Sequence, residues 1–267
     1  MNKKKVLGIA LIFVIFIGLV TTIVYIFTEL KEETDINIQQ IENTDAKKFK
    51  SEYESLNGQE VKEGVNYRTL TIDENNPIKY ATASDIVNKI DNKESFIVYF
   101  GFDTCPWCRS IIESMMESAK ANNVSTIYYV DVKNIRDVYT LNEKNEAVRT
   151  TEGTEGYYNL LNRLDGVLED YAPLSYKETK KVRGKKTEVT SYVELNEKRI
   201  YAPNIVLVKE GKALLLTTAI SDDMKDPYME LTDELKKYSL DEFDKLFKEA
   251  NESTTTTIPV CEGPSNC

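Results

Sequence analysis

Two cysteines separated by two residues, Cys105 and Cys108 in the sequence CPWC, are the side chains best suited to chemistry in this chain. They follow the apolar run 96–100, whose length and content of β-branched and aromatic residues are typical of a buried strand. Apolar residues then recur at helical spacing over 111–119, which predicts a helix. Pro106 suits the first position of that helix, where an N–H would have no partner, so Cys105 becomes the N-cap residue.

This placement predicts different roles for the two thiols. The sulfur of Cys105 would face unpaired backbone N–H groups and the positive end of the helix dipole, which favour its thiolate. Cys108 returns to the same side of the first turn, close enough to form a disulfide, and Arg109 adds a supporting cation nearby. An activated thiol beside a resolving thiol is what reversible thiol–disulfide exchange requires. The sequence therefore predicts a catalytic pair.

A purely structural role for the pair stays open in two forms. It could form a static disulfide, although a tight loop at a helix start is the geometry of reactive pairs. It could also be half of a zinc site, but the other two thiolates would have to come from Cys261 and Cys267. The chain contains no histidine, which excludes His-based triads, His metal ligands and His general bases. No metal and no cofactor are expected.

The first residues predict a membrane anchor. Three lysines at 3–5 precede an uncharged run over 6–27, whose 22 residues suffice to span a hydrocarbon core at ~1.5 Å per residue. A cleaved signal peptide is the alternative, but the apolar core is long for one and no A-x-A-like site follows. Lysines before the span and acidic residues after it place the N-terminus in the cytoplasm. We therefore expect a single-pass protein of the cell membrane with an extracytoplasmic C-terminal domain.

The rest of the chain is expected to form one globular domain between two polar segments. Strand composition at 67–72, 96–100 and 124–132, with helical spacing between them, predicts a parallel sheet with right-handed crossovers. A net charge of −10 argues against nucleic acid as a partner. The predicted divisions are a cytoplasmic N-terminus (1–5), an anchor (6–27), a stalk (28–65), a domain (66–250, with an insertion at about 140–200) and a Ser/Thr-rich tail (251–267).

Two features outside the dithiol could also bind partners. The basic segment 177–186 predicts a protruding hairpin, which could meet an acidic partner or anionic lipid head groups, although a solvated hairpin is favoured. In the tail, Cys261 and Cys267 could close a second disulfide loop. A passive loop is favoured over a second dithiol that exchanges with Cys105. Four cysteines in two close pairs fit an oxidising compartment.

The order of motifs resembles a known family. CPWC after a strand is followed much later by Ala202-Pro203, a strand, Lys-Glu-Gly-Lys and another strand. This order resembles thioredoxin-fold proteins, over about residues 66–250. The chain as a whole is similar to bacterial membrane-tethered thioredoxin-like proteins, some of them bacteriocin-transport accessory proteins. The resemblance implies an α/β thioredoxin fold, a central mixed sheet flanked by helices, with an N-terminal transmembrane helix and an insertion before the cis-proline strand.

The resemblance also implies roles for individual residues. Cys105 matches the exposed nucleophile and Cys108 the resolving cysteine. The predicted substrate-binding residues are the dipeptide that tunes the redox potential, the residue whose backbone pairs with a bound substrate chain, and the cis-proline: Pro106, Trp107, Ala202 and Pro203. One position departs from the family pattern. Thioredoxins usually carry a buried aspartate where this chain has Tyr99, which leaves Cys108 without an obvious base. Paired glycines typical of glutaredoxins are absent, so glutathione binding is not favoured.

These observations predict an extracytoplasmic, membrane-anchored thiol–disulfide oxidoreductase. Its expected partners are thiols or disulfides of exported proteins or peptides, and a membrane or extracytoplasmic redox partner that recycles the pair. The direction of electron flow is left open. The alternative is a redox-silent accessory module that uses the same groove to hold an exported peptide or a transporter partner.

Overall fold

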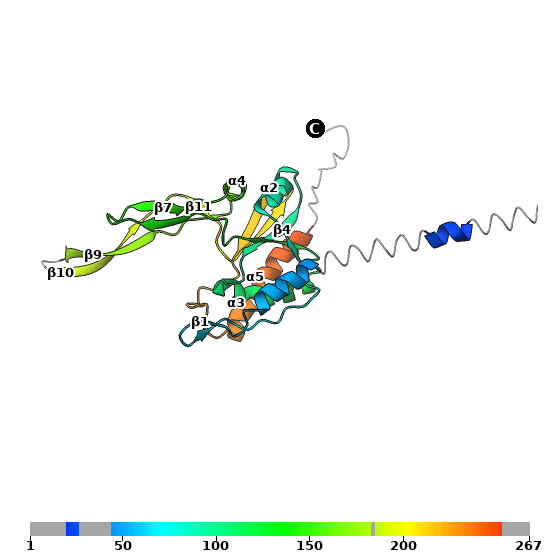
Figure 1. The fold of residues 1–267 in the computed structure, drawn as a ribbon, viewed down its shortest axis with the longest axis horizontal. Helices are drawn as coiled ribbons and strands as arrows, with labels where there is room; N and C mark the ends of the chain where they lie inside the picture. The colour runs from blue at the N-terminus through cyan, green and yellow to red at the C-terminus, as the bar shows by residue number, and fades with distance from the viewer. Residues whose placement is uncertain (1–19, 27–43, 183–184, 253–267) are drawn as a thin grey trace, which may run out of the picture.

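The computed structural model describes residues 20–26, 44–182 and 185–252 (Figure 1). Its central feature is a five-stranded mixed sheet with the strand order β13-β12-β4-β5-β3. Strands β3, β5 and β4 run parallel, whereas β12 is antiparallel to both β4 and β13. The bounds of the five strands are Ile78–Tyr80 (β3), Phe96–Gly101 (β4), Ile127–Asp131 (β5), Asn204–Lys209 (β12) and Lys212–Thr217 (β13).

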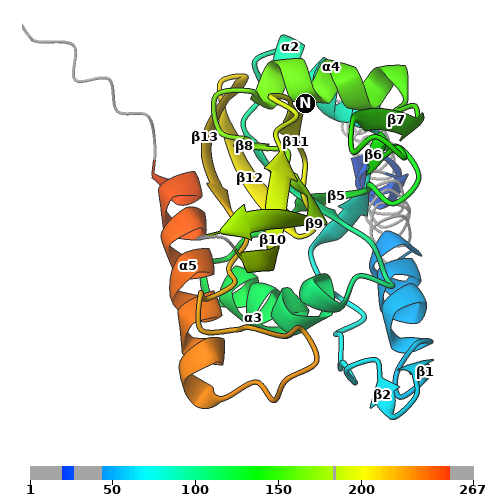
Figure 2. The same ribbon diagram turned by 90° about the vertical axis from the view of Figure 1, so that its left-hand side faces the viewer.

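Helices cover both faces of this sheet (Figure 2). Residues 44–54, α3 and α5 pack on one face, and α2 and α4 pack on the other. Side chains of β4 alternate between the two cores, because Ile97 and Tyr99 belong to the first whereas Val98 and Phe100 belong to the second. Burial on both faces explains why this strand is a continuous apolar run. The helix bounds are Ala83–Asp91 (α2), Pro106–Ala121 (α3), Glu155–Leu164 (α4) and Asp233–Asn251 (α5).

Side-chain caps begin these helices where the sequence supplies them. Thr82 caps α2 in a reciprocal capping box with Asp85, and Thr154 and Thr232 cap α4 and α5. The predicted strand at 96–100 and the predicted helix starting at Pro106 are both confirmed.

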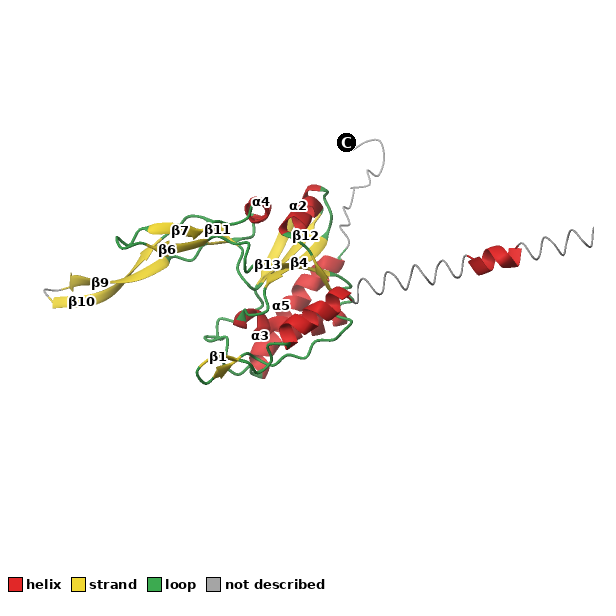
Figure 3. Ribbon diagram, viewed as in Figure 1, coloured by secondary structure: helices red, strands yellow, loops and turns green. Residues whose placement is uncertain are grey.

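Apart from α4, most of the segment between β5 and β12 forms a projection beside the main body (Figure 3). Its strands pair locally: β6 with β7, β8 with β11, and β9 with β10. The β9–β10 hairpin confirms the predicted hairpin around the basic segment 177–186. The strand bounds are Val138–Leu141 (β6), Ala147–Thr151 (β7), Glu169–Asp170 (β8), Leu174–Val182 (β9), Lys185–Val193 (β10) and Lys198–Arg199 (β11). A further small hairpin joins Glu60–Lys62 (β1) and Val65–Asn66 (β2).

Two segments differ from their sequence-based predictions. The strand predicted at 67–72 is wrong, because backbone N–H groups of this segment bond side chains instead of a neighbouring strand. Leu70 N donates to Asn57 Oδ1 at 3.0 Å and Ile72 N donates to Glu54 Oε1 at 2.7 Å. Residues 44–54 are helical, which agrees with the helix that the sequence allows at 45–56 of the stalk, but Phe49 and Tyr53 of this helix are completely buried in the core. Residues 28–43 of the predicted stalk lie outside the described residues.

The predicted transmembrane anchor and fold class require correction. No helix among the described residues is long and apolar enough to cross a bilayer. Of the predicted span, residues 6–19 and 27 lie outside the described residues, and the helical stretch 20–26 would cover only about 10 Å of a ~30 Å hydrocarbon core. The single-pass localisation at the cell membrane is therefore wrong. The predicted class, a thioredoxin fold with an N-terminal transmembrane helix, is corrected to a mixed α/β architecture with no spanning helix in the described part of the chain.

Candidate functional site

The CPWC sequence lies where the central strand β4 passes into helix α3. Cys105 is the N-cap residue with an extended backbone, and Pro106 occupies the first turn, as the sequence predicts. The Sγ atom of Cys105 accepts a hydrogen bond from the backbone N–H of Cys108 at 3.2 Å. This sulfur therefore takes the place of the side-chain oxygen that usually caps a helix.

Residues distant in sequence complete the surroundings of Cys105. Its thiol donates a hydrogen bond to the carbonyl oxygen of Ala202 at 3.3 Å, and the peptide bond between Ala202 and Pro203 is cis. The register of the sheet explains this proximity, because Asn204, the first residue of β12, lies opposite Phe100 near the end of β4. The fold thus brings the predicted Ala202-Pro203 dipeptide beside the cysteine pair.

The dithiol is more enclosed than the sequence predicts. Cys105, expected to be exposed, retains 2% of its accessible surface, and Cys108 retains none. Both are free thiols. Pro106 and Trp107 are half-buried beside them. Charge that develops on either sulfur is therefore stabilised mainly by protein groups, not by bulk water.

The two thiols titrate in opposite directions. The pKa of Cys105 is lowered chiefly by a hydrogen bond from the Cys108 thiol, and burial opposes this effect. The backbone N–H of Cys108 and the positive charge of Arg136 lower the pKa further. Burial raises the pKa of Cys108 well above its ordinary value, and the neighbouring Cys105 sulfur adds to this. The pair can therefore hold one thiolate and one thiol, with the negative charge on Cys105.

Arg109 occupies a different environment from the one expected of a supporting cation. The residue is 1% exposed, and its guanidinium bonds oxygen atoms in the segment 53–68, which precedes the sheet. It donates to Tyr53 O at 2.7 Å and to Asn57 Oδ1 at 2.8 Å, and it also bonds Arg68 O at 3.1 Å through Nε. These bonds tie α3 to the helix at 44–54. Arg109 thereby holds the helix at 44–54 in place against α3, the helix that carries the dithiol at its start.

The cation that acts on Cys105 is Arg136, which sequence reasoning missed. Its guanidinium lies 5.4 Å from the ring of Phe102, its Nη1 donates to Ile200 O at 3.4 Å, and its buried Nε has no hydrogen-bond partner. No motif marks this residue. The available signal was topological, because Arg136 follows strand β5, and the carboxyl ends of adjacent parallel strands meet at one edge of a sheet.

Tyr99 is completely buried on the central strand β4, in the same core as Cys108. Burial raises the pKa of Tyr99 well above its ordinary value, and the nearby Cys108 sulfur adds to this effect. Tyr53 and Tyr129 pack around it from the helix at 44–54 and from β5. A layer of tyrosines thus packs in the same core as Cys108.

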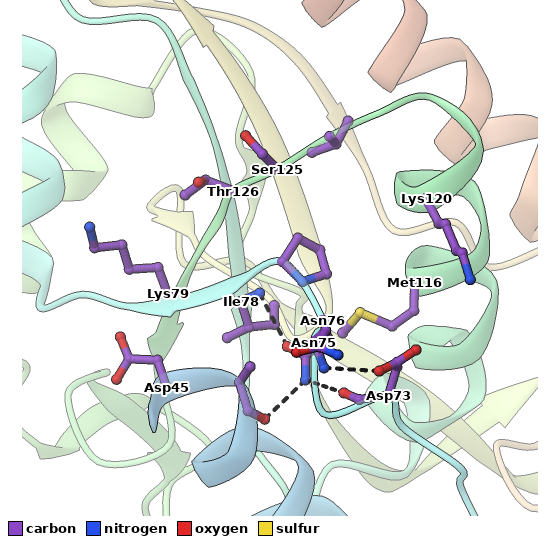
Figure 4. Close-up of a pocket in the computed structure, with 13 residues that line it drawn as sticks. Asp45, Asp73, Asn75, Asn76, Ile78, Lys79, Met116, Lys120, Ser125 and Thr126 are labelled. Atoms are coloured by element: carbon purple, nitrogen blue, oxygen red, sulfur yellow. Dashed lines mark hydrogen bonds between the residues drawn. The ribbon is translucent and has the colours of Figure 1, made fainter. Parts of the chain in front are cut away.

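A pocket formed by the described residues lies away from the dithiol (Figure 4). It measures about 690 Å³, and α3 contributes Met116 and Lys120 to its lining. At ~1.5 Å per residue, these side chains start ~16 Å or more along the helix from Cys105. Asn76, at the base of the pocket, is already bonded to Ala46 O at 2.9 Å and to Asp73 O at 2.7 Å. This pocket therefore contributes nothing to the cysteine chemistry.

The tail cysteines Cys261 and Cys267 lie outside the described residues, so the structure places neither of them relative to the dithiol. The second disulfide, which depends on them, stays a prediction, and the zinc site stays the alternative that the sequence disfavours. No protein-family model matches the chain, and no curated protein matches it significantly.

Proposed function

We propose that this protein is a thiol–disulfide oxidoreductase in which Cys105 is the nucleophile and Cys108 the resolving thiol. The observation that carries the proposal is the capping geometry of Cys105, whose sulfur receives the backbone N–H of Cys108 at the start of α3. The opposite pKa shifts of the two thiols support the same assignment. Exchange needs one thiolate that attacks the substrate disulfide and a second thiol that later resolves the mixed disulfide.

The reaction balances with the two cysteines and a substrate disulfide alone. The Cys105 thiolate attacks one substrate sulfur, a mixed disulfide forms, and the other substrate sulfur leaves as a thiolate that takes up a proton. Cys108 then loses its proton and attacks Cys105 Sγ, which releases the second substrate thiol. Two electrons pass from the dithiol to the substrate. The reverse sequence oxidises a substrate dithiol, and the reduction potential decides which direction dominates.

Substrate chains would approach beside the Ala202-Pro203 peptide. The Ala202 carbonyl already lies 3.3 Å from Cys105 Sγ, so an extended substrate that pairs with this backbone would place its own sulfur near the nucleophile. Half-buried Pro106 and Trp107 supply apolar surface next to it. The proposed partners are disulfides or thiols of proteins or peptides, and a redox partner that recycles the pair.

The proposal is tested by equilibrating the full chain with glutathione buffers in a Cys261→Ser/Cys267→Ser background, which isolates the CPWC pair. A reduction potential near about −270 mV would make the protein a reductant, and one near about −120 mV an oxidant. Cys108→Ser should trap a mixed disulfide with a peptide substrate, whereas Cys105→Ser should trap none. If the pair shows no reversible exchange and Cys108→Ser traps nothing, the oxidoreductase proposal fails.

A redox-silent binding module is the second candidate, and the near-complete burial of both sulfurs favours it. Such a module would hold a peptide beside Ala202 and Pro203 without forming a covalent bond. The two candidates separate in Cys105→Ser, because an enzyme loses all exchange whereas a binding module keeps its affinity for the peptide.

A further inference from the structure

The β9–β10 hairpin lies at the end of the projection and has a charge opposite to that of the rest of the chain (Figure 1). Of residues 174–193, six are lysine or arginine and two are glutamate. This hairpin, which we call the basic arm, therefore carries a net charge of +4 in a chain whose net charge is −10. The remaining residues accordingly carry −14, so the arm is the part of the molecule suited to an acidic partner.

Ion pairs within the basic arm neutralise only the lysines farther from its turn. Lys177 Nζ lies 2.8 Å from Glu188 Oε1. Lys180 Nζ lies 2.7 Å from Glu178 Oε1. These two pairs occupy both glutamates of the arm. The three lysines nearest the turn are exposed and form no ion pair with another residue in the described part of the chain: Lys181, Lys185 and Lys186.

The register of the hairpin places two of these unneutralised charges opposite each other. Lys181 and Lys186 are direct partners across the two strands. Like charges in this arrangement repel each other and disfavour the pairing of the strands. An anionic group bound close to both ammonium groups would relieve the repulsion. The end of the arm is therefore suited to a carboxylate.

The backbone of the basic arm also has free hydrogen-bonding edges. Among the described residues, its sheet consists of β9 and β10 alone. The outer edge of each strand therefore presents N–H and C=O groups that no neighbouring strand of this part of the chain pairs with. A two-stranded hairpin is only marginally stable by itself in water, and a third strand would stabilise it. An extended polypeptide can supply that strand.

One face of the basic arm combines lysines with an exposed aromatic ring. Lys181, Lys186 and Tyr192 lie on the same face, because side chains alternate along each strand and the two lysines are direct partners. Tyr192 is 65% exposed, and tyrosine is a frequent anchor at protein interfaces. An extended segment of about seven residues, roughly 20 Å long, would reach from Lys186 to Tyr192.

We propose that the basic arm binds an acidic, extended segment of a partner polypeptide, which adds as a strand to an edge of the arm and places its carboxylates beside Lys181 and Lys186. Such a segment would pair with the free edge and neutralise the lysines. A flat anionic membrane would meet the lysines but leave the edge groups of the backbone unpaired. Nucleic acid, a long polyanion, would also meet the negative charge of the remaining residues. The inference does not depend on the proposed function, because this binding is noncovalent and needs no cysteine.

The experiment measures binding of a fluorescein-labelled peptide of alternating glutamate and threonine to the reduced full chain, by fluorescence anisotropy. A peptide of alternating glutamine and threonine is the neutral control. We expect the acidic peptide to bind more tightly than the neutral one, with an affinity that falls as ionic strength rises. The acidic peptide N-methylated throughout its backbone should bind at least about tenfold more weakly, because it has lost the N–H groups that pair with a strand edge.

Substitutions then locate the site on the chain. Lys181→Glu/Lys186→Glu should weaken binding of the acidic peptide by about tenfold to thirtyfold, since two modest attractions become repulsions. Lys212→Glu/Lys236→Glu is the matched control, because it makes the same change in net charge at exposed lysines of β13 and α5, and it should leave the affinity nearly unchanged. Tyr192→Ala should weaken binding by about fivefold.

Three outcomes would overturn the inference. They are equal affinity for the acidic and neutral peptides, equal affinity of the arm variant and its matched control, and undiminished binding of the N-methylated peptide. The lysines would then serve to keep the edges of the hairpin from pairing with other strands. Binding to phosphatidylserine vesicles but not to the acidic peptide would also overturn it and assign the arm to a membrane surface. The oxidoreductase function is tested separately, because the peptide contains no cysteine.

Discussion

Cys105 and Cys108 are three residues apart, yet their surroundings shift the pKa values of the two thiols in opposite directions. Cys105 faces backbone N–H groups, the Ala202 carbonyl and Arg136, and its pKa is lowered. Cys108 faces the apolar core and the tyrosines, and its pKa is raised. Polar, directional contacts thus surround one sulfur, and a packed aromatic layer surrounds the other. The contrast shows that the reactivity of a CXXC pair depends on which parts of the fold enclose each thiol.

The largest expected effect comes from removing the packing behind Cys108. The ring of Phe49 lies 4.4 Å from that of Tyr53 and 5.1 Å from that of Tyr129, and Phe49 is completely buried. We expect Phe49→Ala to lower the free energy of unfolding by about 3–5 kcal/mol, measured by urea denaturation. Lys47→Ala, at an exposed position of the same helix, should change it by less than about 0.5 kcal/mol. Equal effects of the two substitutions would show that the helix at 44–54 is not part of the core.

Gly101→Ala should disturb the Cys108 side while leaving the Cys105 side intact. The added methyl group overlaps the hydroxyl and ring of Tyr99, and overpacking of this kind typically costs about 1–3 kcal/mol. We expect a lower unfolding midpoint in urea and slower resolution of a mixed disulfide, with formation by Cys105 preserved. Gly166→Ala, where an added Cβ meets no atom within 4 Å, is the control. An unfolding midpoint in Gly101→Ala equal to that of the control would contradict the close packing of Tyr99 against Gly101.

Arg136→Gln should act on the opposite thiol. Loss of the nearby positive charge raises the pKa of Cys105, so alkylation of Cys105 at pH values below its midpoint should slow, by a factor on the order of three. Arg163→Gln serves as the control, because Arg163 is an exposed arginine paired with Asp91 at 3.1 Å. If Arg136→Gln alkylates at the same rate as the control across the pH range, Arg136 does not stabilise the thiolate.

The smallest expected effect is a pH dependence of stability with opposite signs for the two cysteines. Because folding lowers the pKa of Cys105, its contribution to the stability of the reduced protein is present above the unfolded pKa of about 8.5 and is lost as pH falls through the folded pKa. Because folding raises the pKa of Cys108, its contribution is present below about pH 8.5 and declines as pH rises above that value.

Chemical denaturation of the reduced chain from pH 6 to pH 10 measures these contributions. Cys108→Ser should flatten the decline above about pH 8.5, and Cys105→Ser should flatten the rise below it, each with a slope of at most about 1.4 kcal/mol per pH unit. Identical profiles for the two variants would mean that the folded state does not distinguish the thiols.

The sequence was sufficient where local chemistry decides the structure. Pro106 after Cys105 predicted the helix start and the capping role of the sulfur, and the apolar run before it predicted a buried central strand. It was insufficient where partners come from distant segments. Tyr53 lies 46 residues from Tyr99 in sequence, and although a helix is allowed at 45–56, its polar, charge-rich composition does not indicate that the helix is buried in the core. The same polar composition explains why residues 44–54 are predicted as part of a stalk.

Arg109 and Arg136 illustrate the same limit for charges. Arg109 is adjacent to the motif, but most of its hydrogen bonds go to Tyr53 in the helix at 44–54 and to Asn57 and Arg68 in the segment that follows it. Arg136 is far from Cys105 in sequence and reaches it because β4 and β5 are parallel neighbours. Distance along the chain was therefore a poor guide to which cation acts on the thiolate. The anchor prediction rested on the composition and length of 6–27 and on the residues that flank it, and no helix among the described residues is long and apolar enough to bear it out.

The most direct test of the central claim, that Cys105 is the activated thiol and Cys108 the resolving one, is alkylation of the reduced full chain across pH, with the modified cysteine identified by peptide mapping. The account predicts that Cys105 is modified first, with a pH midpoint below the ordinary thiol value of about 8.5, while Cys108 stays unmodified. Modification of Cys108 at an equal or greater rate, or a Cys105 midpoint at or above the ordinary value, would contradict it.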